Sequence, residues 1–184
     1  MRLNEADILF IPGLGNSGPD HWQTRWQVKI RTALRVEQAE WDRPVCADWM
    51  GRIVATAHSA TRPVILIAHS CGVAAVLHAA PKLDASRVRG AFLVACTDPA
   101  SPVAPAAAAS FGPLPSAPLP FPSLLIASRN DPFCTYGRAE NLALDLGAAL
   151  VDAGDSGHIN MASGHGPWPE GLMQLAAFMR RLKN

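Results

Sequence analysis

Val64-Ile-Leu-Ile-Ala-His-Ser-Cys-Gly72 joins an apolar run to a serine and then to a segment of small apolar residues. Residues 63–68 have the length and composition of a buried strand, and residues 71–80 have little polar surface, as a buried helix would. Ser70 falls at the turn between them. The pattern is that of a nucleophile elbow, G-x-S-x-G, with Ala68 in the first glycine position. It predicts that Ser70 is an exposed nucleophile.

Strands and helices alternate on both sides of this unit. We expect strands at residues 6–11, 35–39, 63–68, 90–95, 123–127 and 149–151. We expect helices at 47–60, 71–80 and 136–146, another from Pro169 onward, and one near Asp20 whose core face is Trp22, Trp26, Ile30 and Ala33. The alternation predicts a three-layer α/β/α sandwich with about six parallel strands, in a single domain over residues 1–184.

Residues 97–122 differ from the rest of the chain, because eight prolines interrupt an alanine-rich background. Neither a central strand nor a long helix tolerates this spacing of proline, so we expect an irregular excursion. It is either a short lid that borders the site or a surface connector.

Composition and charge exclude several classes of function. The formal net charge of +1 gives no reason to expect a nucleic-acid partner or an anionic membrane surface. No window approaches the roughly 20 apolar residues of a membrane span, and the first apolar run is too short for a signal peptide. Four scattered cysteines, without a C-x-x-C pair, are typical of free thiols in a reducing cytoplasm. No histidine or cysteine motif predicts a metal site, and we expect no cofactor.

An acid and a base follow the elbow in the order that this fold uses, which is Ser, then Asp or Glu, then His. Asp131 follows the fifth predicted strand, and His158 follows the sixth. His158 would take the proton of Ser70, while Asp131 would hold the other ring nitrogen. Asp98 and Asp155 are rival acids that rank below Asp131.

The loop after the first strand, Gly13-Leu-Gly-Asn-Ser-Gly18, has two interpretations. It spells G-x-G-x-x-G, a dinucleotide fingerprint for which Glu37, Glu40 or Asp42 would be the ribose-binding acid. Pro19, however, delays the helix past the third glycine, and a dinucleotide site would leave the other loops unexplained. In a hydrolase the same loop supplies an oxyanion amide, which we expect at Leu14, beside the amide of Cys71.

Several side chains near these loops have further candidate roles. His69 is expected to pack under the elbow. Cys71 is an alternative nucleophile, but it lies one position past the exposed tip of the turn. The predicted lining of the substrate pocket consists of His21, Trp22, Phe133 and Trp168.

Taken together, these stretches resemble the small α/β-hydrolases related to retinoblastoma-binding protein 9. The similarity runs nearly end to end. Its motifs are Ile11-Pro-Gly-Leu-Gly-Asn-Ser-Gly-Pro-Asp-His-Trp-Gln23, Ala68-His-Ser-Cys-Gly72, Phe121-Pro-Ser-Leu-Leu-Ile-Ala-Ser128, Asn130-Asp-Pro132 and Gly157-His-Ile-Asn160.

The resemblance implies a compact α/β-hydrolase fold that lacks the first antiparallel strands. It also implies a Ser70–Asp131–His158 triad and hydrolysis of esters or amides. The chain departs from the family at Ala68, which replaces the first glycine of the elbow, and at Cys71, where a larger apolar residue is common. Retinoblastoma binding is not carried over, because the motif L-x-C-x-E is absent.

The sequence therefore predicts a serine hydrolase that acts on a small ester or amide through an acyl-enzyme. The alternative is a binding or regulatory module on a hydrolase scaffold with little turnover, since fold alone does not fix function. The substrate and the oligomeric state are left open.

Overall fold

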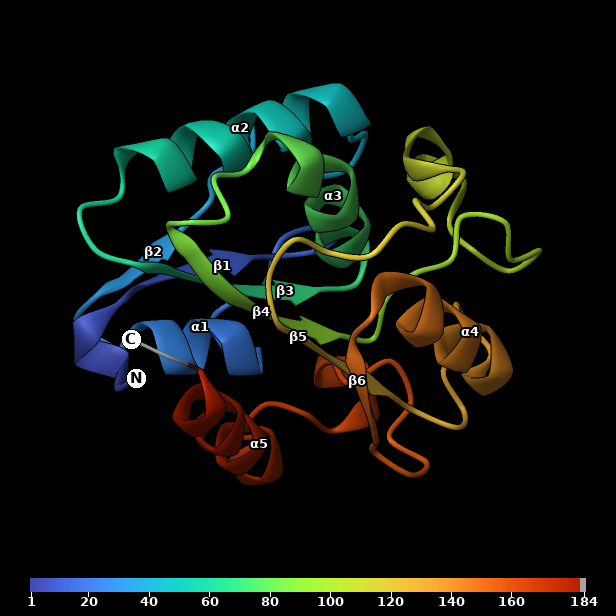
Figure 1. Cartoon of the computed structure of the whole chain (residues 1–184). Coiled ribbons are helices and arrows are strands. Elements are labelled where there is room, and N and C mark those ends of the chain that lie inside the picture. Colours follow the sequence, from blue (N-terminus) through green and yellow to red (C-terminus); the bar gives the residue numbers. More distant parts are fainter. Residues whose placement is uncertain (183–184) are drawn as a thin grey trace.

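A six-stranded parallel sheet forms the centre of the computed structural model, which describes residues 1–182 (Figure 1). The strand order is β2-β1-β3-β4-β5-β6, and all neighbouring strands are parallel. The strands are β1 (Asp7–Ile11), β2 (Ala33–Arg35), β3 (Val64–His69), β4 (Val88–Val94), β5 (Ser123–Ala127) and β6 (Ala149–Asp152). This is the sheet that the alternation of strands and helices predicts.

Helices cover both faces of the sheet (Figure 1). One face carries α2 (Cys46–Ser59), α3 (Cys71–Ala79) and α4 (Tyr136–Leu146), and the other carries α1 (Trp22–Gln27) and α5 (Pro169–Arg181). Short 3-10 helices lie at Leu3–Glu5, Ala80–Lys82, Ala106–Phe111 and Met161–Ser163. The result is the predicted three-layer α/β/α sandwich.

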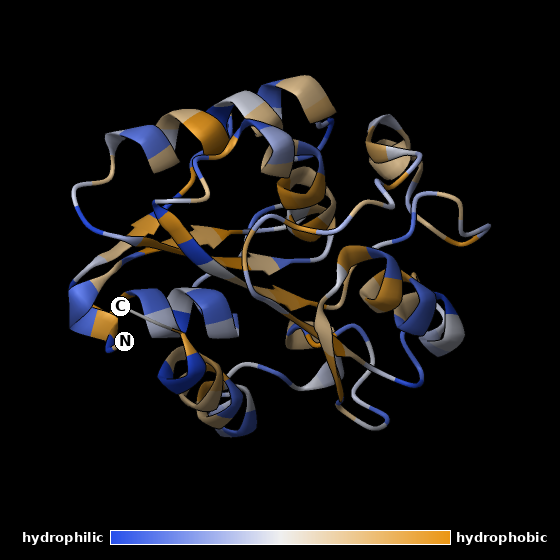
Figure 2. Cartoon of the chain, viewed as in Figure 1, coloured by the Kyte–Doolittle hydropathy of each residue, from blue (hydrophilic) through white to orange (hydrophobic). Residues whose placement is uncertain are grey.

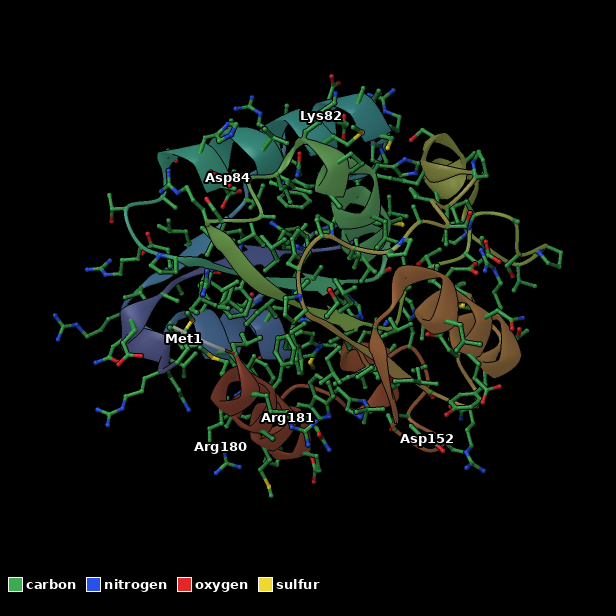
Figure 3. All side chains as sticks on the ribbon, in the orientation of Figure 1. Met1, Lys82, Asp84, Asp152, Arg180 and Arg181 are labelled. Carbon is green, nitrogen blue, oxygen red and sulfur yellow. The ribbon has the colours of Figure 1, made fainter. Side chains whose placement is uncertain are left out.

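The core forms on both faces because the central strands are buried and apolar at most positions. Successive residues of β1 alternate between the two cores: Leu9 packs toward α2 and α3, whereas Ile8 and Phe10 pack toward α1 and α5. Figure 2 shows the same apolar colour along the inner strands, with mixed colours on the helices. Charged side chains such as Asp152 and Arg180 are exposed at the outside of the molecule (Figure 3). Buried strands of this kind are typical of parallel sheets with helices on both sides.

The first helix is shorter than the sequence pattern predicts. α1 ends at Gln27, and Ala33, expected on its core face, instead begins β2. Pairing with β1 sets this boundary, because the N–H of Ile8 donates to the carbonyl of Thr32 (2.9 Å) and Ala33 pairs with Ile8. The predicted strand at 35–39 therefore lies two residues too late. A backbone ladder with β1 outweighs the helical spacing of the apolar residues.

The proline-rich excursion is anchored in the core. Within it, Ala106–Phe111 forms a 3-10 helix, and the fully buried ring of Phe111 packs edge-on against Trp49 with centroids 5.4 Å apart. The ring Nε2 of His78 in α3 donates to the carbonyl of Phe111 (2.8 Å). The excursion is irregular, as predicted, but its middle is packed against α2 and α3.

Candidate active site

The elbow between β3 and α3 holds Ser70 in a strained backbone conformation. Its φ is 58° and its ψ is −128°, a combination that residues with a side chain seldom adopt. The N–H of Ser70 donates to the carbonyl of Val94 at the end of β4 (3.0 Å), which ties the turn to the neighbouring strand. The side chain of Ser70 consequently lines a cavity at the carboxyl edge of the sheet.

Two glycines allow the first loop to approach this elbow closely. A Cβ at Gly72 would collide with the carbonyl oxygens of Ile11 and Pro12 at the end of β1. A Cβ at Gly13 would lie 2.6 Å from the Cβ of Ser70. Both glycines are therefore needed for close packing, and the loop that follows β1 lies directly against Ser70.

Three side chains from three loops form one chain of hydrogen bonds. Ser70 Oγ lies 2.8 Å from His158 Nε2, and His158 Nδ1 lies 2.9 and 3.0 Å from the two carboxylate oxygens of Asp131. All three residues are buried. Asp131 is the carboxylate that contacts His158. The rival Asp98 pairs with Arg138 instead (3.2 Å).

The geometry fixes where the protons lie when His158 is neutral. Nδ1 faces two carboxylate oxygens, which only accept, so this nitrogen carries the ring proton and donates it. Nε2 then has a free lone pair and accepts from the hydroxyl of Ser70. The N–H of Phe133 donates to Asp131 Oδ1 (2.9 Å) and orients that carboxylate. The arrangement suits general-base activation of a serine.

The backbone around His158 is held from two sides. His69 Nε2 donates to the carbonyl of His158 (2.9 Å), and the indole N–H of Trp22 donates to the carbonyl of Ile159 (2.9 Å). Ile159 is buried with a left-handed φ of 46°, which the surrounding contacts must stabilise. The ring of Phe133 packs edge-on against that of His158 with centroids 4.8 Å apart. His69 is therefore buried beside the elbow and holds the backbone of His158, a contact that was not predicted from the sequence.

Burial keeps the two neighbouring histidines uncharged. It lowers the pKa of His69 well below the ordinary value, and the nearby His158 and His21 lower it further. Burial also lowers the pKa of His21 to about 4, with a smaller contribution from the charge of Arg35. The Nδ1 of His21 accepts from the N–H of Gln23 (3.2 Å) and caps α1, so the ring proton is on Nε2. His21 is thus a neutral residue on the wall of the cavity.

The cavity beside Ser70 has a volume of about 490 Å³. Its lining carries no Asp, Glu, Lys or Arg side chain, and it includes two of the predicted pocket residues, His21 and Phe133. The excursion contributes Pro105 to the wall of the cavity. The remaining lining residues are Gly13, Leu14, Asn16, Gly18, His69, Ser70, Cys71, Thr97, His158, Asn160, Met161 and Ala162.

The other two predicted pocket residues, Trp22 and Trp168, lie outside this cavity, so these predictions were wrong. Trp22 is fully buried, and its ring packs edge-on against that of Trp168 with centroids 5.0 Å apart. Trp168 also stacks on Trp26 at 5.6 Å. Their large apolar surfaces are buried in the core between the sheet and the helices α1 and α5.

The two predicted oxyanion donors lie at the cavity wall. Leu14 and Cys71 both line the cavity. The thiol of Cys71 is buried, and burial raises its pKa against smaller lowering effects from hydrogen bonds with Thr97, the Leu14 backbone and Ser70. A thiol that resists ionisation is a poor nucleophile, which argues against Cys71 as an alternative to Ser70.

The described residues were also searched for metal sites, membrane-spanning helices and disulfides. Within residues 1–182, no group of three or more His, Cys, Asp or Glu side chains is placed to hold a metal ion. No helix in this part of the chain has the length and apolar character needed to cross a membrane. The four cysteines are buried free thiols.

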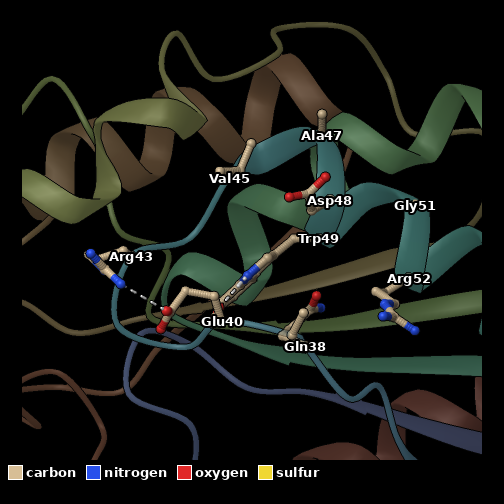
Figure 4. Close-up of a pocket in the computed structure, with 10 residues that line it drawn as sticks. Gln38, Glu40, Arg43, Val45, Ala47, Asp48, Trp49, Gly51 and Arg52 are labelled. Carbon is tan, nitrogen blue, oxygen red and sulfur yellow. Dashed lines mark hydrogen bonds and ion pairs between the residues drawn. The ribbon is translucent and has the colours of Figure 1, made fainter.

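A second cavity, of about 320 Å³, lies beside the N-terminal half of α2, and its lining does not include Ser70, Asp131 or His158 (Figure 4). The indole N–H of Trp49 donates there to the carbonyl of Glu40 (3.1 Å), and the Glu40 carboxylate pairs with Arg43 (3.5 Å). The amide group of Gln38 is buried at this cavity without a hydrogen-bond partner among the described residues. The residues that line this cavity and those that line the Ser70 cavity are different sets.

Sequence reasoning missed one residue whose side chain contacts Ser70 Oγ. Thr97 Oγ1 lies 3.0 Å from Ser70 Oγ and is buried at the cavity wall. Its position just after β4, next to β3 in the sheet, is a signal that the strand order would have supplied. The pairing of β3 with β4 was not predicted from the sequence.

The sequence matches a family model, and the structure superposes on several solved hydrolases. A family model described as serine hydrolase matches residues 8–177. A YdeN-like hydrolase from Pectobacterium atrosepticum superposes with a TM-score of 0.83 at 34% identity, over 95% of this chain and 90% of the other. The ydeN gene product of B. subtilis superposes with a TM-score of 0.80 at 20% identity, over 96% of this chain and all (100%) of the other. Thermogutta terrifontis esterase 2 shares the fold, with a TM-score of 0.67 at 15% identity over 100% and 88% of the two chains. No curated protein matches.

Proposed function

Because the chain belongs to the serine hydrolase family, we propose that it cleaves a small ester or amide through an acyl-enzyme formed on Ser70. The observation that carries this proposal is the continuous hydrogen-bond chain from Ser70 Oγ through His158 to the carboxylate of Asp131. The chain borders a cavity that is large enough for a small substrate. It is the arrangement that activates a serine hydroxyl at neutral pH.

In the first half of the reaction, Ser70 Oγ attacks the carbonyl carbon of the substrate. The Oγ–H bond breaks and its proton moves to His158 Nε2, while a bond forms between Oγ and the carbon. Asp131 stays ionised and stabilises the imidazolium that results. The proton on Nε2 then passes to the leaving alcohol or amine, which departs and leaves an ester on Ser70.

In the second half, a water molecule repeats the sequence. His158 takes a proton from the water, whose oxygen attacks the acyl carbon, and then returns that proton to Ser70 Oγ as the acid product leaves. The backbone amides of Leu14 and Cys71 are the proposed donors to the negative oxygen in both tetrahedral intermediates. Their place on the cavity wall beside Ser70 supports this role, and each donor of this type typically contributes roughly 10²- to 10³-fold in rate.

The cavity lining supports an uncharged acyl group as the substrate moiety. The lining contains no Asp, Glu, Lys or Arg side chain. His21 and His69, whose pKa values are lowered by burial, are neutral. A charged acyl group would lose its hydration without gaining an ion pair. We therefore expect short neutral esters to be better substrates than esters of dicarboxylic or amino acids.

The narrower placement, with the hydrolases related to retinoblastoma-binding protein 9, is also a proposal that rests on the shared motifs around the triad and the first loop. The four buried free thiols support the proposed cytoplasmic location. A small neutral molecule is the proposed partner, since the net charge of +1 favours neither nucleic acid nor an anionic surface.

A fluorophosphonate probe tests the proposed function, because it reacts with an activated serine without requiring the natural substrate. The wild-type protein should be labelled at Ser70, and Ser70→Ala should not be labelled. The same pair should differ in hydrolysis of p-nitrophenyl butyrate. Equal labelling of both proteins would contradict the proposal. A folded protein with no Ser70-dependent turnover on a panel of esters and amides would favour the binding-module alternative.

A further inference from the structure

We infer that the hydroxyl of Thr97 is a catalytic hydrogen-bond donor to Ser70 Oγ, which stabilises the charge on that oxygen as its proton leaves. The inference rests on the proposed function, because it adds a fourth side chain to the Ser70–His158–Asp131 machinery. Its starting point is that Ser70 Oγ has two side-chain partners, His158 Nε2 at 2.8 Å and Thr97 Oγ1 at 3.0 Å.

The direction of the second hydrogen bond follows from the first. Ser70 has one hydroxyl proton, and a neutral His158 with its proton on Nδ1 has only a lone pair at Nε2. The proton of Ser70 must therefore point to His158. Ser70 Oγ then has only lone pairs left for Thr97, so Thr97 donates and Ser70 accepts. Distance alone allows either direction, and the tautomer of His158 selects one.

The structure holds Thr97 in place on both sides. Before it, Ala95 has a left-handed φ of 49°, and its N–H donates to the carbonyl of Ile126 in β5 (2.9 Å). After it, the N–H of Asp98 donates to the carbonyl of Phe133 (3.0 Å), and the Asp98 carboxylate pairs with Arg138. Thr97 itself is 1% exposed. A donor that is already oriented needs no reorganisation when charge develops on its acceptor.

The hydrogen bond should matter more in the transition state than before it. Oγ is a neutral hydroxyl oxygen in the resting enzyme, it gains negative charge as His158 takes its proton, and it is a weakly accepting ester oxygen in the acyl-enzyme. Hydrogen bonds to an ionised partner are roughly twice as strong as neutral ones. Thr97 keeps its own proton throughout, so no atom is added to the reaction. Only this difference in strength accelerates the reaction.

The same reasoning applies to the second half of the reaction. When the acyl group leaves Ser70, Oγ again passes through a state with developing negative charge before His158 returns its proton. Thr97 should therefore assist both the formation and the breakdown of the acyl-enzyme. A residue that only shaped the acyl pocket would affect binding of the acyl group and not both chemical steps.

Three substitutions at Thr97 and one at Ser70 test the inference. Thr97→Val replaces the hydroxyl by a methyl group of similar size, Thr97→Ser keeps the hydroxyl, and Thr97→Ala removes both groups. The measured quantity is the second-order rate constant for labelling of Ser70 by a fluorophosphonate probe, with kcat/KM for p-nitrophenyl butyrate as a second readout. Ser70→Ala gives the background, and thermal unfolding shows whether each variant is folded.

We expect Thr97→Val and Thr97→Ala to be labelled roughly 10- to 100-fold more slowly than the wild type, a range at and below that of single oxyanion donors. Thr97→Ser should stay within roughly threefold of the wild type.

If Thr97→Val reacts at the wild-type rate while Ser70→Ala is inert, the inference about Thr97 is overturned and the proposed function stands. If Thr97→Ser is as slow as Thr97→Ala, the methyl group matters and the hydroxyl does not, which also overturns it. If the wild type is labelled no faster than Ser70→Ala, the proposed function fails as well.

Discussion

In the proposed mechanism Ser70 attacks the substrate only while His158 takes its proton, so the two side chains should behave as a unit. We predict that Ser70→Ala and His158→Ala each lower kcat/KM for a p-nitrophenyl ester by roughly a thousandfold or more. The double variant should be no slower than the slower single variant. Steady-state kinetics on the four proteins measures this coupling.

His58→Ala is the matched control for this experiment, because His58 is exposed on α2 and does not line the cavity beside Ser70. It should keep wild-type activity. Effects of Ser70→Ala and His158→Ala that multiply in the double variant would show that the two residues act independently, against the proposed mechanism.

The neutral state of His21 predicts a dependence of stability on pH. The folded protein holds the pKa of His21 at about 4, chiefly through burial, against 6.5 as the ordinary value. Below pH 6.5 the unfolded chain binds a proton at this position that the folded protein does not bind. The free energy of unfolding should therefore fall between pH 6.5 and pH 4, by up to about 3 kcal/mol from this residue.

Urea unfolding at several pH values between 4 and 7 measures the effect. His21→Asn is a suitable variant, because asparagine also caps helices through its side-chain oxygen but does not titrate. The variant should lose less stability on acidification than the wild type, and the buried His69 should account for part of the remaining loss. Parallel curves for the two proteins would contradict the assignment.

At the scale of single residues, the sequence predicts site residues that directly follow a predicted strand, where the loops of a parallel sheet carry the chemistry. Ser70, Asp131 and His158 were predicted because each follows an apolar run that is typical of a strand, in the order that the fold uses, and the structure brings the three side chains within hydrogen-bond distance. Thr97 and the supporting indole of Trp22 have no such signal. Their roles depend on side-chain hydrogen bonds between segments far apart in the chain, such as the one from Trp22 to the carbonyl of Ile159.

Packing of α3 against the end of β1 gives a prediction for a whole element. A Cβ at Gly72, in the first turn of α3, would collide with the carbonyl oxygens of Ile11, the last residue of β1, and of Pro12, the first residue of the following loop. Gly72→Ala should push this loop away from the elbow. We expect it to lower the free energy of unfolding by about 1–3 kcal/mol and to slow labelling of Ser70.

Gly51→Ala provides the contrast. Gly51 lies inside α2, and nothing comes within 4 Å of a Cβ built there. Alanine in this exposed helical position should raise the free energy of unfolding by about 0.5–1 kcal/mol and leave labelling unchanged. Thermal unfolding of both variants tests the pair. A Gly72→Ala protein as stable and reactive as the wild type would show that the β1 loop adjusts without consequence.

Elements whose boundaries depend on local chemistry were predicted well, and one that depends on pairing was not. α4 spans the predicted 136–146, where Thr135 caps its start and the left-handed Gly147 ends it. The apolar spacing from Trp22 to Ala33 also reads as a helix. There, however, the ladder between β2 and β1 sets the end of α1, and a single sequence does not reveal that pairing.

On the scale of the whole molecule, the site lies where the strand order reverses. The chain passes from β1 outward to β2 and then returns to β3 on the other side of β1. The connections that leave β1 and β3 therefore run to opposite faces of the sheet, through α1 and α3, and ligands bind at such a switch point in open α/β sheets. The loops after β4, β5 and β6 bring Thr97, Asp131 and His158 to the same edge.

The opposite edge of the sheet should contribute to stability without affecting the chemistry. Asp7 begins β1 there, and its buried carboxylate accepts from the N–H groups of Thr61 (2.8 Å) and Arg62 (2.9 Å) and from the Arg62 guanidinium (3.0 Å). Burial alone would raise the pKa of Asp7, but these hydrogen bonds outweigh it, and the pKa lies below the ordinary 3.8. The folded protein therefore favours the charged form more than the unfolded chain does.

Asp7→Asn tests this separation of stability from activity. The change keeps a side-chain oxygen but removes the charge, and it should lower the free energy of unfolding by about 1–2 kcal/mol at pH 7. Because the pKa is depressed on folding, the contribution of Asp7 is present above pH 3.8 and is lost as the pH falls below that value, so the two proteins should converge in strong acid. Urea unfolding at pH 7 and pH 3 measures both effects.

The rate of fluorophosphonate labelling should match the wild type at pH 7, since Asp7 lies at the amino end of its strand and Ser70 at the carboxyl edge. Slower labelling of a folded Asp7→Asn protein would show instead that the amino edge influences the geometry of the triad.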